Sequence, residues 1–292
     1  MKTKVIKKNT TKKTDTNFVK IRSRHPSHSV LRRKISTLYN VIFRLGSTTP
    51  TSEITKNPNV IEINTVEAVK NSANKLLMKQ CFTEAGIKTA DWWTFDNSNR
   101  FFNRTAGGHT AYDDLPYPIV TKHIYGSRGT GNTLIKSKAE LEQWIKGKTL
   151  ANYIFEKFYN YSREYRLHIT SERCFYTCRK MLKEETPDDK RWFRNDSNSV
   201  WILEENENFD KPVNWSDIIK HSILALNAVG LTVGAVDVKV QSATTLNKLG
   251  KEVTRKEPEF IIIEINSAPS FGEVTATKYA EELPIIIEKL NK

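Results

Sequence analysis

Two apolar segments in the second half of the chain carry side chains that can bind cations. Glu264 and Asn266 lie two residues apart in one segment, and Asp237 interrupts the other. On a strand, side chains two positions apart leave the same face, and an unpaired buried carboxylate is costly. If the two strands are neighbours, three oxygen ligands meet at one place, which suits Mg²⁺ bound together with substrate phosphates. A buried ion pair is the alternative explanation for any one acid alone.

A glycine-rich loop follows an apolar segment that contains Lys122. Four small residues of this loop are candidate phosphate ligands: Gly126, Ser127, Gly129 and Gly131. Their backbone N–H groups can face phosphates while the lysine neutralises the charge. The loop is neither a Walker loop nor a dinucleotide-binding fingerprint, because no Gly-Lys-Ser/Thr follows at the required spacing and no helix follows directly. A flexible hairpin is the alternative interpretation.

Acidic and basic residues alternate with apolar residues in two further segments. Glu156, Lys157 and Phe158 form one group, and Glu164 with Arg166 forms the other. By itself this alternation is typical of the solvated face of a sheet. It acquires a functional meaning only together with the motifs around it.

Strands are needed to position these residues, and the apolar periodicity predicts them. The predicted strands are residues 39–43, 60–63, 118–124, 153–158, 164–170, 174–181, 200–203, 232–240 and 260–265. The four consecutive strands between residues 153 and 203 alternate with polar turns and indicate a largely antiparallel sheet. Residues 241–258 are polar and are expected to form a loop or a hairpin.

Apolar residues at helical spacing predict the helices. The strongest signal runs from a capping box formed by Asn64 and Glu67 to Gly86. The other helical segments are residues 137–147, residues 214–230 and a C-terminal segment broken or restarted at Pro284. Ser137 and Glu140 form a second capping box.

The composition is that of a globular protein. The chain has 292 residues, of which 38% are hydrophobic, and at roughly 100–200 residues per domain we expect two packed units. No apolar run approaches the roughly 18 residues that a membrane-spanning helix needs. Three cysteines and the lack of an apolar signal segment at the start predict a reducing compartment, the cytoplasm.

The net charge of +13 is concentrated at the N-terminus. Residues 1–34 hold twelve Lys or Arg and one acid, a net charge of +11, which leaves +2 for the other 258 residues. A basic segment with few apolar residues is expected to be a flexible arm that lies mostly outside the fold. Its functional interpretation is attachment to nucleic acid or another polyanion, and a solubilising tail is the alternative.

Read in order, these motifs resemble those of the ATP-grasp superfamily. Four consecutive motifs carry the resemblance: Asn74-Lys75, Pro118 to Lys122, Glu156-Lys157-Phe158 with Glu164, and Asp237 with Glu264 and Asn266. The resemblance covers about residues 40–292. It is greatest to the ligases that add glutamate to a ribosomal protein and to glutathione synthetases, in which similar Glu-Ile-Asn-Ser-x-Pro endings occur.

The resemblance implies an α+β fold with two subdomains whose antiparallel sheets sandwich a nucleotide. The expected organisation is a basic arm (1–34), a shortened N-terminal α/β segment (35–90), a small subdomain with the glycine loop (91–155) and a C-terminal subdomain with the metal site (156–292). The usual N-terminal domain helps to bind substrate, so its shortening weakens inference about the substrate.

The resemblance also implies roles for the candidate residues. Lys75, Lys122 and the glycine loop would contact the phosphates of ATP. Residues 156–158 would bind adenine through backbone groups, and Glu164 would bind ribose. Asp237, Glu264 and Asn266 would hold Mg²⁺, with Mn²⁺ as an alternative.

The implied reaction is ATP-dependent joining of a carboxylate to an amine. A substrate carboxylate attacks the γ-phosphorus, and the acyl phosphate is captured by an amine with release of ADP and phosphate. Arg166 and Arg179 are candidate catalytic residues because a guanidinium pairs bidentately with an acyl phosphate or an oxyanion. A cross-strand salt bridge is the alternative for each arginine.

A different class of function stays open at this point. The chain could be a nucleic-acid-binding or macromolecule-docking protein that keeps the scaffold without ligase turnover, using the basic arm together with Trp92, Trp93 and Phe95. Packing in the core is the alternative for these aromatics. The substrates implied by the ligase alternative are an unidentified carboxylate and amine, which include peptides and proteins. Stand-alone proteins of this kind also occur in bacteriophage genomes, and the Lys, Asn and Ile-rich composition is consistent with such an origin in a host cytoplasm.

Overall fold

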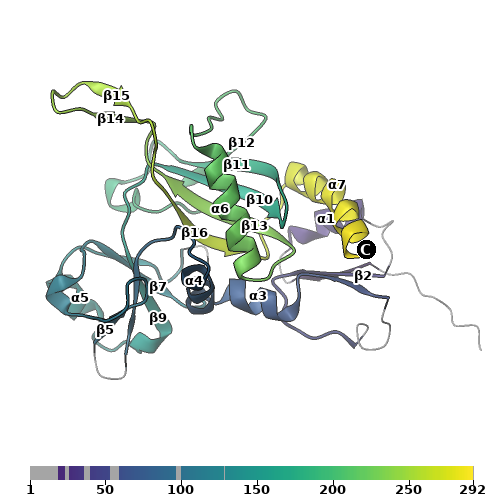
Figure 1. Ribbon diagram of the computed structural model, residues 1–292, viewed down its shortest axis with the longest axis horizontal. Coiled ribbons are helices and arrows are strands. Elements are labelled where there is room, and N and C mark those ends of the chain that lie inside the picture. The colour runs from purple at the N-terminus through teal and green to yellow at the C-terminus, as the bar shows by residue number, and fades with distance from the viewer. Residues whose placement is uncertain are drawn as a thin grey trace, which may run out of the picture.

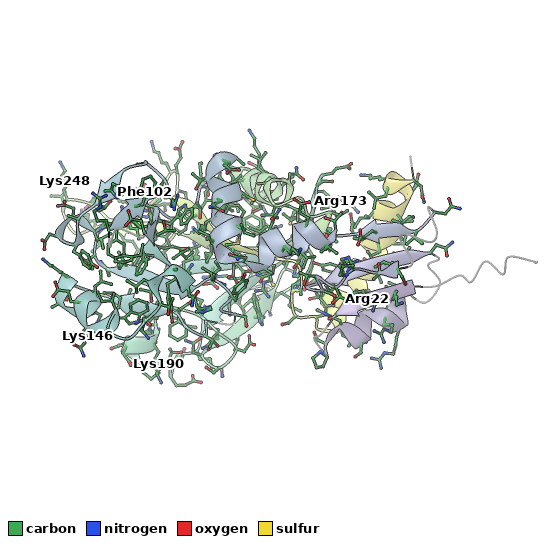
Figure 2. All side chains as sticks on the ribbon, turned by 90° about the horizontal axis from the view of Figure 1, so that it is seen from below. Arg22, Phe102, Lys146, Arg173, Lys190 and Lys248 are labelled. Carbon is green, nitrogen blue, oxygen red and sulfur yellow. The ribbon has the colours of Figure 1, made fainter. Side chains whose placement is uncertain are left out.

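The computed structural model describes residues 19–23, 26–35, 40–52, 59–96, 100–127 and 129–291. Figure 2 shows an elongated molecule with Phe102 and Lys146 toward one end and Arg22 and Arg173 toward the other. The helices within the described ranges are α1 (His28–Lys34), α3 (Val66–Ala73), α4 (Lys75–Glu84), α5 (Lys138–Trp144), α6 (Trp215–Ala228) and α7 (Glu273–Leu290). Among these described helices, none is long and apolar enough to cross a membrane.

A small parallel sheet lies at one end of the molecule. It has the order β1-β2-β3 and consists of β1 (Val19–Ser23), β2 (Val41–Leu45) and β3 (Ile61–Ile63). The helices α1 and α7 pack next to it (Figure 1), and Ile21, Leu31 and Phe43 are buried in their shared core. β2 and β3 come from the predicted N-terminal segment (35–90), whereas β1 comes from the predicted arm.

The prediction that residues 1–34 form a flexible arm is wrong for β1 and α1. Ile21 and Leu31 are only 6% and 0% exposed, whereas Arg32 and Arg33 of the same helix are exposed. The basic side chains therefore do not oppose folding, and a few apolar residues suffice to attach the segment to β2 and α7. Residues 1–18 lie outside the described ranges, so the arm stays a prediction there.

Replacement of Leu31 by alanine tests the contribution of this segment. We expect the free energy of unfolding to fall by about 2–5 kcal/mol, because a fully buried leucine leaves a cavity. Arg32→Ala is the matched control and is expected to change stability by less than about 0.5 kcal/mol. Urea unfolding followed by circular dichroism measures both. Equal stability of Leu31→Ala and the natural chain would show that α1 does not belong to the cooperative unit.

A six-stranded antiparallel sheet forms the opposite end of the molecule, with the order β6-β5-β4-β9-β7-β8. Its strands are β4 (Trp92–Phe95), β5 (Phe101–Asn103), β6 (His109–Thr110), β7 (Ile119–His123), β8 (Thr133–Ile135) and β9 (Tyr153–Lys157). Helix α5 packs on this sheet. Ser137 caps the N-terminus of α5 and accepts a hydrogen bond from the Glu140 N–H, as predicted. Because β9 extends to Lys157, the predicted subdomain boundary at 155/156 falls inside a strand of this sheet.

Trp92 and Trp93 are 1% and 3% exposed in this sheet. Their indole nitrogens donate to Thr83 and Thr110, both at 3.0 Å. A buried indole with a satisfied N–H cannot stack on a nucleic-acid base. The alternative use of these two tryptophans as nucleic-acid contacts is therefore wrong.

A five-stranded antiparallel sheet forms the centre, with the order β12-β11-β10-β13-β16. Its strands are β10 (Arg163–Thr170), β11 (Cys174–Leu182), β12 (Ser199–Leu203), β13 (Val233–Val240) and β16 (Phe260–Asn266). α6 covers one face of this sheet (Figure 1), where Tyr165, Leu167 and Val238 are fully buried. Because side chains alternate, the intervening charged residues leave the opposite face.

Two helices replace the single helix predicted between residues 64 and 86. Asn74 adopts an extended conformation between α3 and α4, and its side chain caps α4 by accepting from the N–H groups of Leu76 and Leu77. Thr65, not Asn64, caps α3. Asn64 has a φ of 62° and binds the backbone of Val233 instead, which ties the start of α3 to β13.

The remaining predictions concern the end of the chain. Residues 241–258 contain the hairpin of β14 (Thr244–Leu246) and β15 (Glu252–Thr254), which projects from the central sheet (Figure 1), as predicted. Pro284 neither breaks nor restarts the last helix, because α7 continues through it. The helix tolerates this proline while it packs its buried residues, such as Tyr279 and Leu283, against the small parallel sheet.

Candidate functional site

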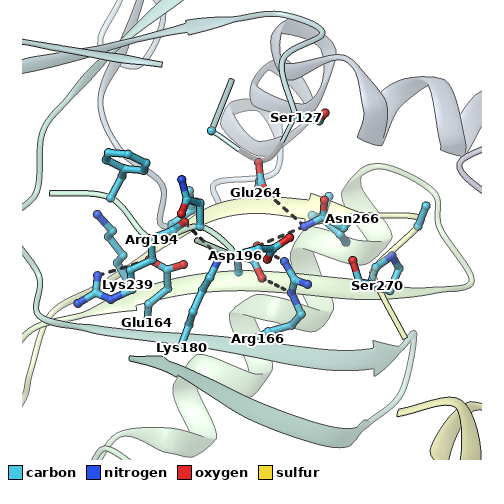
Figure 3. Close-up of a pocket in the computed structure, with 18 of the residues that line it drawn as sticks. Ser127, Glu164, Arg166, Lys180, Arg194, Asp196, Lys239, Glu264, Asn266 and Ser270 are labelled. Atoms are coloured by element: carbon cyan, nitrogen blue, oxygen red, sulfur yellow. Dashed lines mark hydrogen bonds and ion pairs between the residues drawn. The ribbon is translucent and has the colours of Figure 1, made fainter. Parts of the chain in front are cut away.

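A cavity of about 950 Å³ lies between the six-stranded and the five-stranded sheets. The glycine loop, the exposed face of the central sheet and residues 267–275 also line it. Most of the residues predicted from the motifs meet here: Lys75, Lys122, Gly126, Ser127, Gly129, Glu156, Lys157, Phe158, Glu164, Arg166, Asp237, Glu264 and Asn266. Figure 3 shows how several of these side chains converge. Gly131 and Arg179 do not line the cavity.

The three predicted oxygen ligands lie together on two adjacent strands. Asp237 of β13 is directly opposite Glu264 of β16 in the antiparallel register. The Nδ2 of Asn266 lies 3.3 Å from Oδ2 of Asp237 and 3.4 Å from Oε1 of Glu264 (Figure 3). Burial raises the pKa of Glu264, but Lys75, Lys122 and Arg166 outweigh it and hold this pKa below its usual value. Glu264 is therefore an anion at neutral pH.

This oxygen cluster fits a hard divalent cation. Within the described residues, no group of three or more His, Cys, Asp or Glu side chains could hold a metal ion. The cluster itself offers two carboxylates, and Asn266 adds its amide oxygen only after its amide group turns, because its Nδ2 faces both acids. Such a partial set suits Mg²⁺, which usually binds proteins through one or two carboxylates together with substrate phosphates. Mn²⁺ accepts the same oxygen ligands.

Lys122 is part of a buried lysine–glutamate–lysine cluster. Its Nζ lies 2.6 Å from Oε2 of Glu156, and the Nζ of Lys79 lies 3.2 Å from Oε1 of the same carboxylate. Burial raises the pKa of Glu156, but the two lysines reverse this and hold it below its usual value. Burial lowers the pKa of Lys79 to about 8 despite its partner. Lys122 reaches the cavity, whereas Lys79 is fully buried behind it.

Glu164 lies in a second charged cluster on the floor of the cavity. Its two register partners are Lys180 on β11 and Lys239 on β13, and Arg194 approaches its carboxylate to 3.5 Å (Figure 3). Burial raises the pKa of Glu164 against the influence of these cations. Burial also lowers the pKa of Lys239 to about 8. Burial therefore disfavours the charged forms of both Glu164 and Lys239 in this cluster.

The glycine loop is attached to the metal-site face by one lysine. The Nζ of Lys75 lies 2.5 Å from the carbonyl oxygen of Gly126 and 3.7 Å from Oε2 of Glu264. At Gly126, a Cβ would lie only 2.6 Å from the backbone oxygen of Thr130, so a larger residue would force the loop to move. Lys75 thus joins the loop that can hold phosphates to the strand that can hold a cation.

Lys157 and Phe158, two of the residues expected to bind adenine, use their backbone N–H groups in hydrogen bonds within the protein. The N–H groups of Lys157 and Phe158 donate to the carbonyl oxygens of Asp91 and Pro118. Of their backbone groups, only the carbonyl oxygens can therefore bind a nucleotide base. The side chain of Phe158 lines the cavity with Lys239 5.6 Å from its ring.

The two predicted arginines lie on opposite faces of the central sheet. Arg166 lines the cavity and forms a bidentate pair with Asp237, its register partner on β13. Arg179 leaves the other face, where it pairs with Asp210. The alternative interpretation of Arg166, a cross-strand salt bridge, is therefore confirmed. Arg179 does not lie at the cavity. Sequence reasoning placed both on strands without the register that separates their faces.

Several cavity residues were missing from the sequence prediction. Lys180 lies one position after Arg179 and therefore faces the cavity, and Lys239 lies two positions after Asp237 on the same face. The alternation along these strands could have identified both residues. Lys79, which lies behind the cavity, could not be identified from the sequence because its partner Glu156 lies far away along the chain.

Comparison with known proteins supports the fold. No protein-family model matches the chain, and no curated protein sequence matches it. The solved structure of the ATP-grasp ligase PsnB, complexed with a minimal precursor, is similar with a TM-score of 0.60 and 13% identity. The match covers 95% of this chain and 100% of that chain.

Two solved D-alanine–D-alanine ligases are also similar. The enzyme from Bacillus anthracis, complexed with ATP, has a TM-score of 0.56 and 15% identity over 89% of this chain and 82% of that chain. The enzyme from Coxiella burnetii has a TM-score of 0.53 and 14% identity over 87% of this chain and 68% of that chain. This chain therefore has the ATP-grasp fold, which confirms the fold class predicted from its motifs.

Proposed function

We propose that the protein is a Mg²⁺-dependent ligase that uses ATP to join a carboxylate to an amine through an acyl phosphate, releasing ADP and phosphate. One observation carries the proposal. A single cavity brings the acids Asp237 and Glu264 and the amide Asn266 together with Lys75 and Lys122. A protein that only bound a macromolecule would gain little from acids and lysines clustered around one cavity.

The residues of the cavity have complementary parts in this reaction. Lys75, Lys122 and the glycine loop bind the phosphates of ATP and neutralise their charge, while Glu164 accepts hydrogen bonds from the ribose. Asp237, Glu264 and Asn266 hold Mg²⁺, which supplies charge stabilisation to the phosphates. Phosphoryl transfer depends mainly on positioning and charge neutralisation, so no nucleophilic side chain is required.

Cations elsewhere on the floor stabilise the charge that develops during transfer. Arg166 and Lys180 line the cavity on the same face as Asp237. A guanidinium pairs bidentately with an acyl phosphate, and a lysine acts as a point charge. Residues 267–275 and Gly46 line the cavity from the side of the small parallel sheet and α7. This side is where we place the carboxylate and amine substrates.

The test is product release from Mg·ATP by the intact chain and by Glu264→Ala, in the presence of pooled amino acids, peptides or macromolecular extract. We expect ADP and phosphate in equal amounts, dependent on one pool, and a loss of about 100-fold or more in the variant. Release of AMP would contradict the acyl-phosphate route. Bound ATP without turnover in any pool would favour the docking alternative.

A further inference from the structure

Asp237 is fully engaged by a cation that belongs to the protein itself. The Nε of Arg166 lies 2.7 Å from Oδ1 of Asp237, and its Nη2 lies 2.8 Å from Oδ2 (Figure 3). The two residues are direct register partners on β10 and β13, and their side chains are 15% and 10% exposed. Bidentate charge-assisted pairs of this kind are strong, and little water competes with this one.

The second acid of the cluster is engaged much less. Glu264 has Lys75 at 3.7 Å from one oxygen and Asn266 at 3.4 Å from the other, and its side chain is 30% exposed. Neither contact is bidentate. Of the two carboxylates, Asp237 is therefore the one whose oxygens must change partners before they bind a metal ion.

A divalent cation and the guanidinium compete for the same carboxylate. Mg²⁺ binds oxygen at about 2.0–2.1 Å and carries the same sign of charge as the arginine. Two cations on one carboxylate in a poorly hydrated place repel each other strongly. Arg166 can leave only if another anion receives it, because an unpaired buried charge is costly.

The cavity provides the route for such an exchange. Arg166 lines the cavity, and its guanidinium lies 4.7 Å from the ring centre of Trp201, which supports one side of the group. A phosphate group that entered beside Asp237 would offer the guanidinium a second bidentate acceptor. Arg166 would then exchange a carboxylate for a phosphate without losing its pairing.

We propose that Arg166 acts as the counter-ion of Asp237 and makes divalent-cation binding depend on the nucleotide. This inference rests on the metal site of the proposed function. Without nucleotide, the arginine occupies Asp237 and the cation binds weakly. With nucleotide, the phosphates receive the arginine and release the carboxylate, so nucleotide and cation bind with positive coupling.

The experiment measures Mn²⁺ binding by electron paramagnetic resonance, using the full chain with and without a non-hydrolysable ATP analogue. We expect Arg166→Gln to bind Mn²⁺ about 10- to 100-fold more tightly than the natural chain in the absence of nucleotide. We also expect the analogue to tighten Mn²⁺ binding less in this variant than in the natural chain. Arg166→Lys keeps the charge but loses the bidentate geometry, so its affinity should lie between the two.

Arg179→Gln is the matched control, because it removes the same charge from the neighbouring strand on the opposite face. Its Mn²⁺ affinity should equal that of the natural chain, which separates the local pair from a general charge effect. Equal Mn²⁺ affinity of folded Arg166→Gln, Arg166→Lys and the natural chain without nucleotide would overturn the inference.

Asp237→Asn distinguishes this inference from the proposed function. If the analogue-bound natural chain binds Mn²⁺ and Asp237→Asn does not, the metal site holds, and the arginine variants alone decide the inference. If the natural chain binds no Mn²⁺ even with the analogue, both the metal site and the inference are wrong.

Discussion

Replacement of Lys122 by methionine should weaken ATP binding by about 10- to 100-fold, because a charge-assisted contact to a phosphate contributes about 1.5–3 kcal/mol. The fold should survive this change. Glu156, the carboxylate that pairs with Lys122, keeps its second lysine, Lys79, at 3.2 Å. Titration calorimetry with ATP in the presence of Mg²⁺ measures the loss of affinity.

Lys79→Met is the matched variant, since it removes the other lysine from the same carboxylate. Lys79 is fully buried and does not line the cavity, and its Nζ also contacts Thr89. We expect this variant to lower the free energy of unfolding by about 3 kcal/mol and to leave the affinity of the folded protein for ATP within about threefold. The opposite pattern, in which Lys79→Met loses ATP and Lys122→Met loses stability, would show that the two roles are assigned the wrong way round.

The contrast between these two lysines also shows the reach of sequence reasoning. Lys122 was identified because it lies in a strand that precedes a glycine loop, and both features are local. Lys79 has only a helical position in the sequence, and its importance comes from Glu156, which is 77 residues away. Local patterns predict the residues that a motif contains, whereas the partners that bury and pair those residues depend on the tertiary fold.

The same distinction explains the errors in the elements. The alternation in β10 and β11 and the apolar runs of β13 and β16 are local signals of burial, so these strands were predicted close to their observed ends. The break between α3 and α4 arises because Asn74 caps the second helix and does not continue the first. The break leaves the helical spacing of the apolar residues unchanged, so the sequence pattern does not reveal it. The folding of β1 and α1 depends on partners in β2 and α7, which composition alone cannot reveal.

Sequence reasoning selected residues that meet in one cavity where residue type limits the chemistry, and their functional roles stay predictions. Acids within apolar strands had to be paired or bound to a cation, and Asp237 and Glu264 do lie opposite each other. The arginines were ambiguous because a guanidinium serves equally in a salt bridge or an anion site. Only the register shows that Arg166 faces the cavity and Arg179 does not.

Lys180 is the cavity residue from which we expect the second large effect. Its Nζ donates to the backbone oxygen of Arg194 at 3.1 Å and lies 5.1 Å from the ring centre of Trp201. In the described part of the chain, no carboxylate lies within ion-pair distance of it. Its register partner Glu164 is approached by Arg194 instead. Like Lys239, whose Nζ donates to the backbone oxygen of Trp192, Lys180 is therefore a charge on the cavity floor that no described carboxylate neutralises at ion-pair distance.

A positive charge held ready in a buried site stabilises negative charge that develops in the transition state more than charge already present in the ground state. Lys180→Met should therefore lower kcat by about 10²–10³-fold, with a change of less than about tenfold in the KM for ATP. Steady-state ADP release with the substrate pool that supports turnover measures both constants. Lys183→Met, just beyond the end of β11 and outside the cavity, removes the same charge and should leave both constants unchanged. If Lys180→Met raised only KM, the residue would bind ATP in its ground state and would not act on the transfer itself.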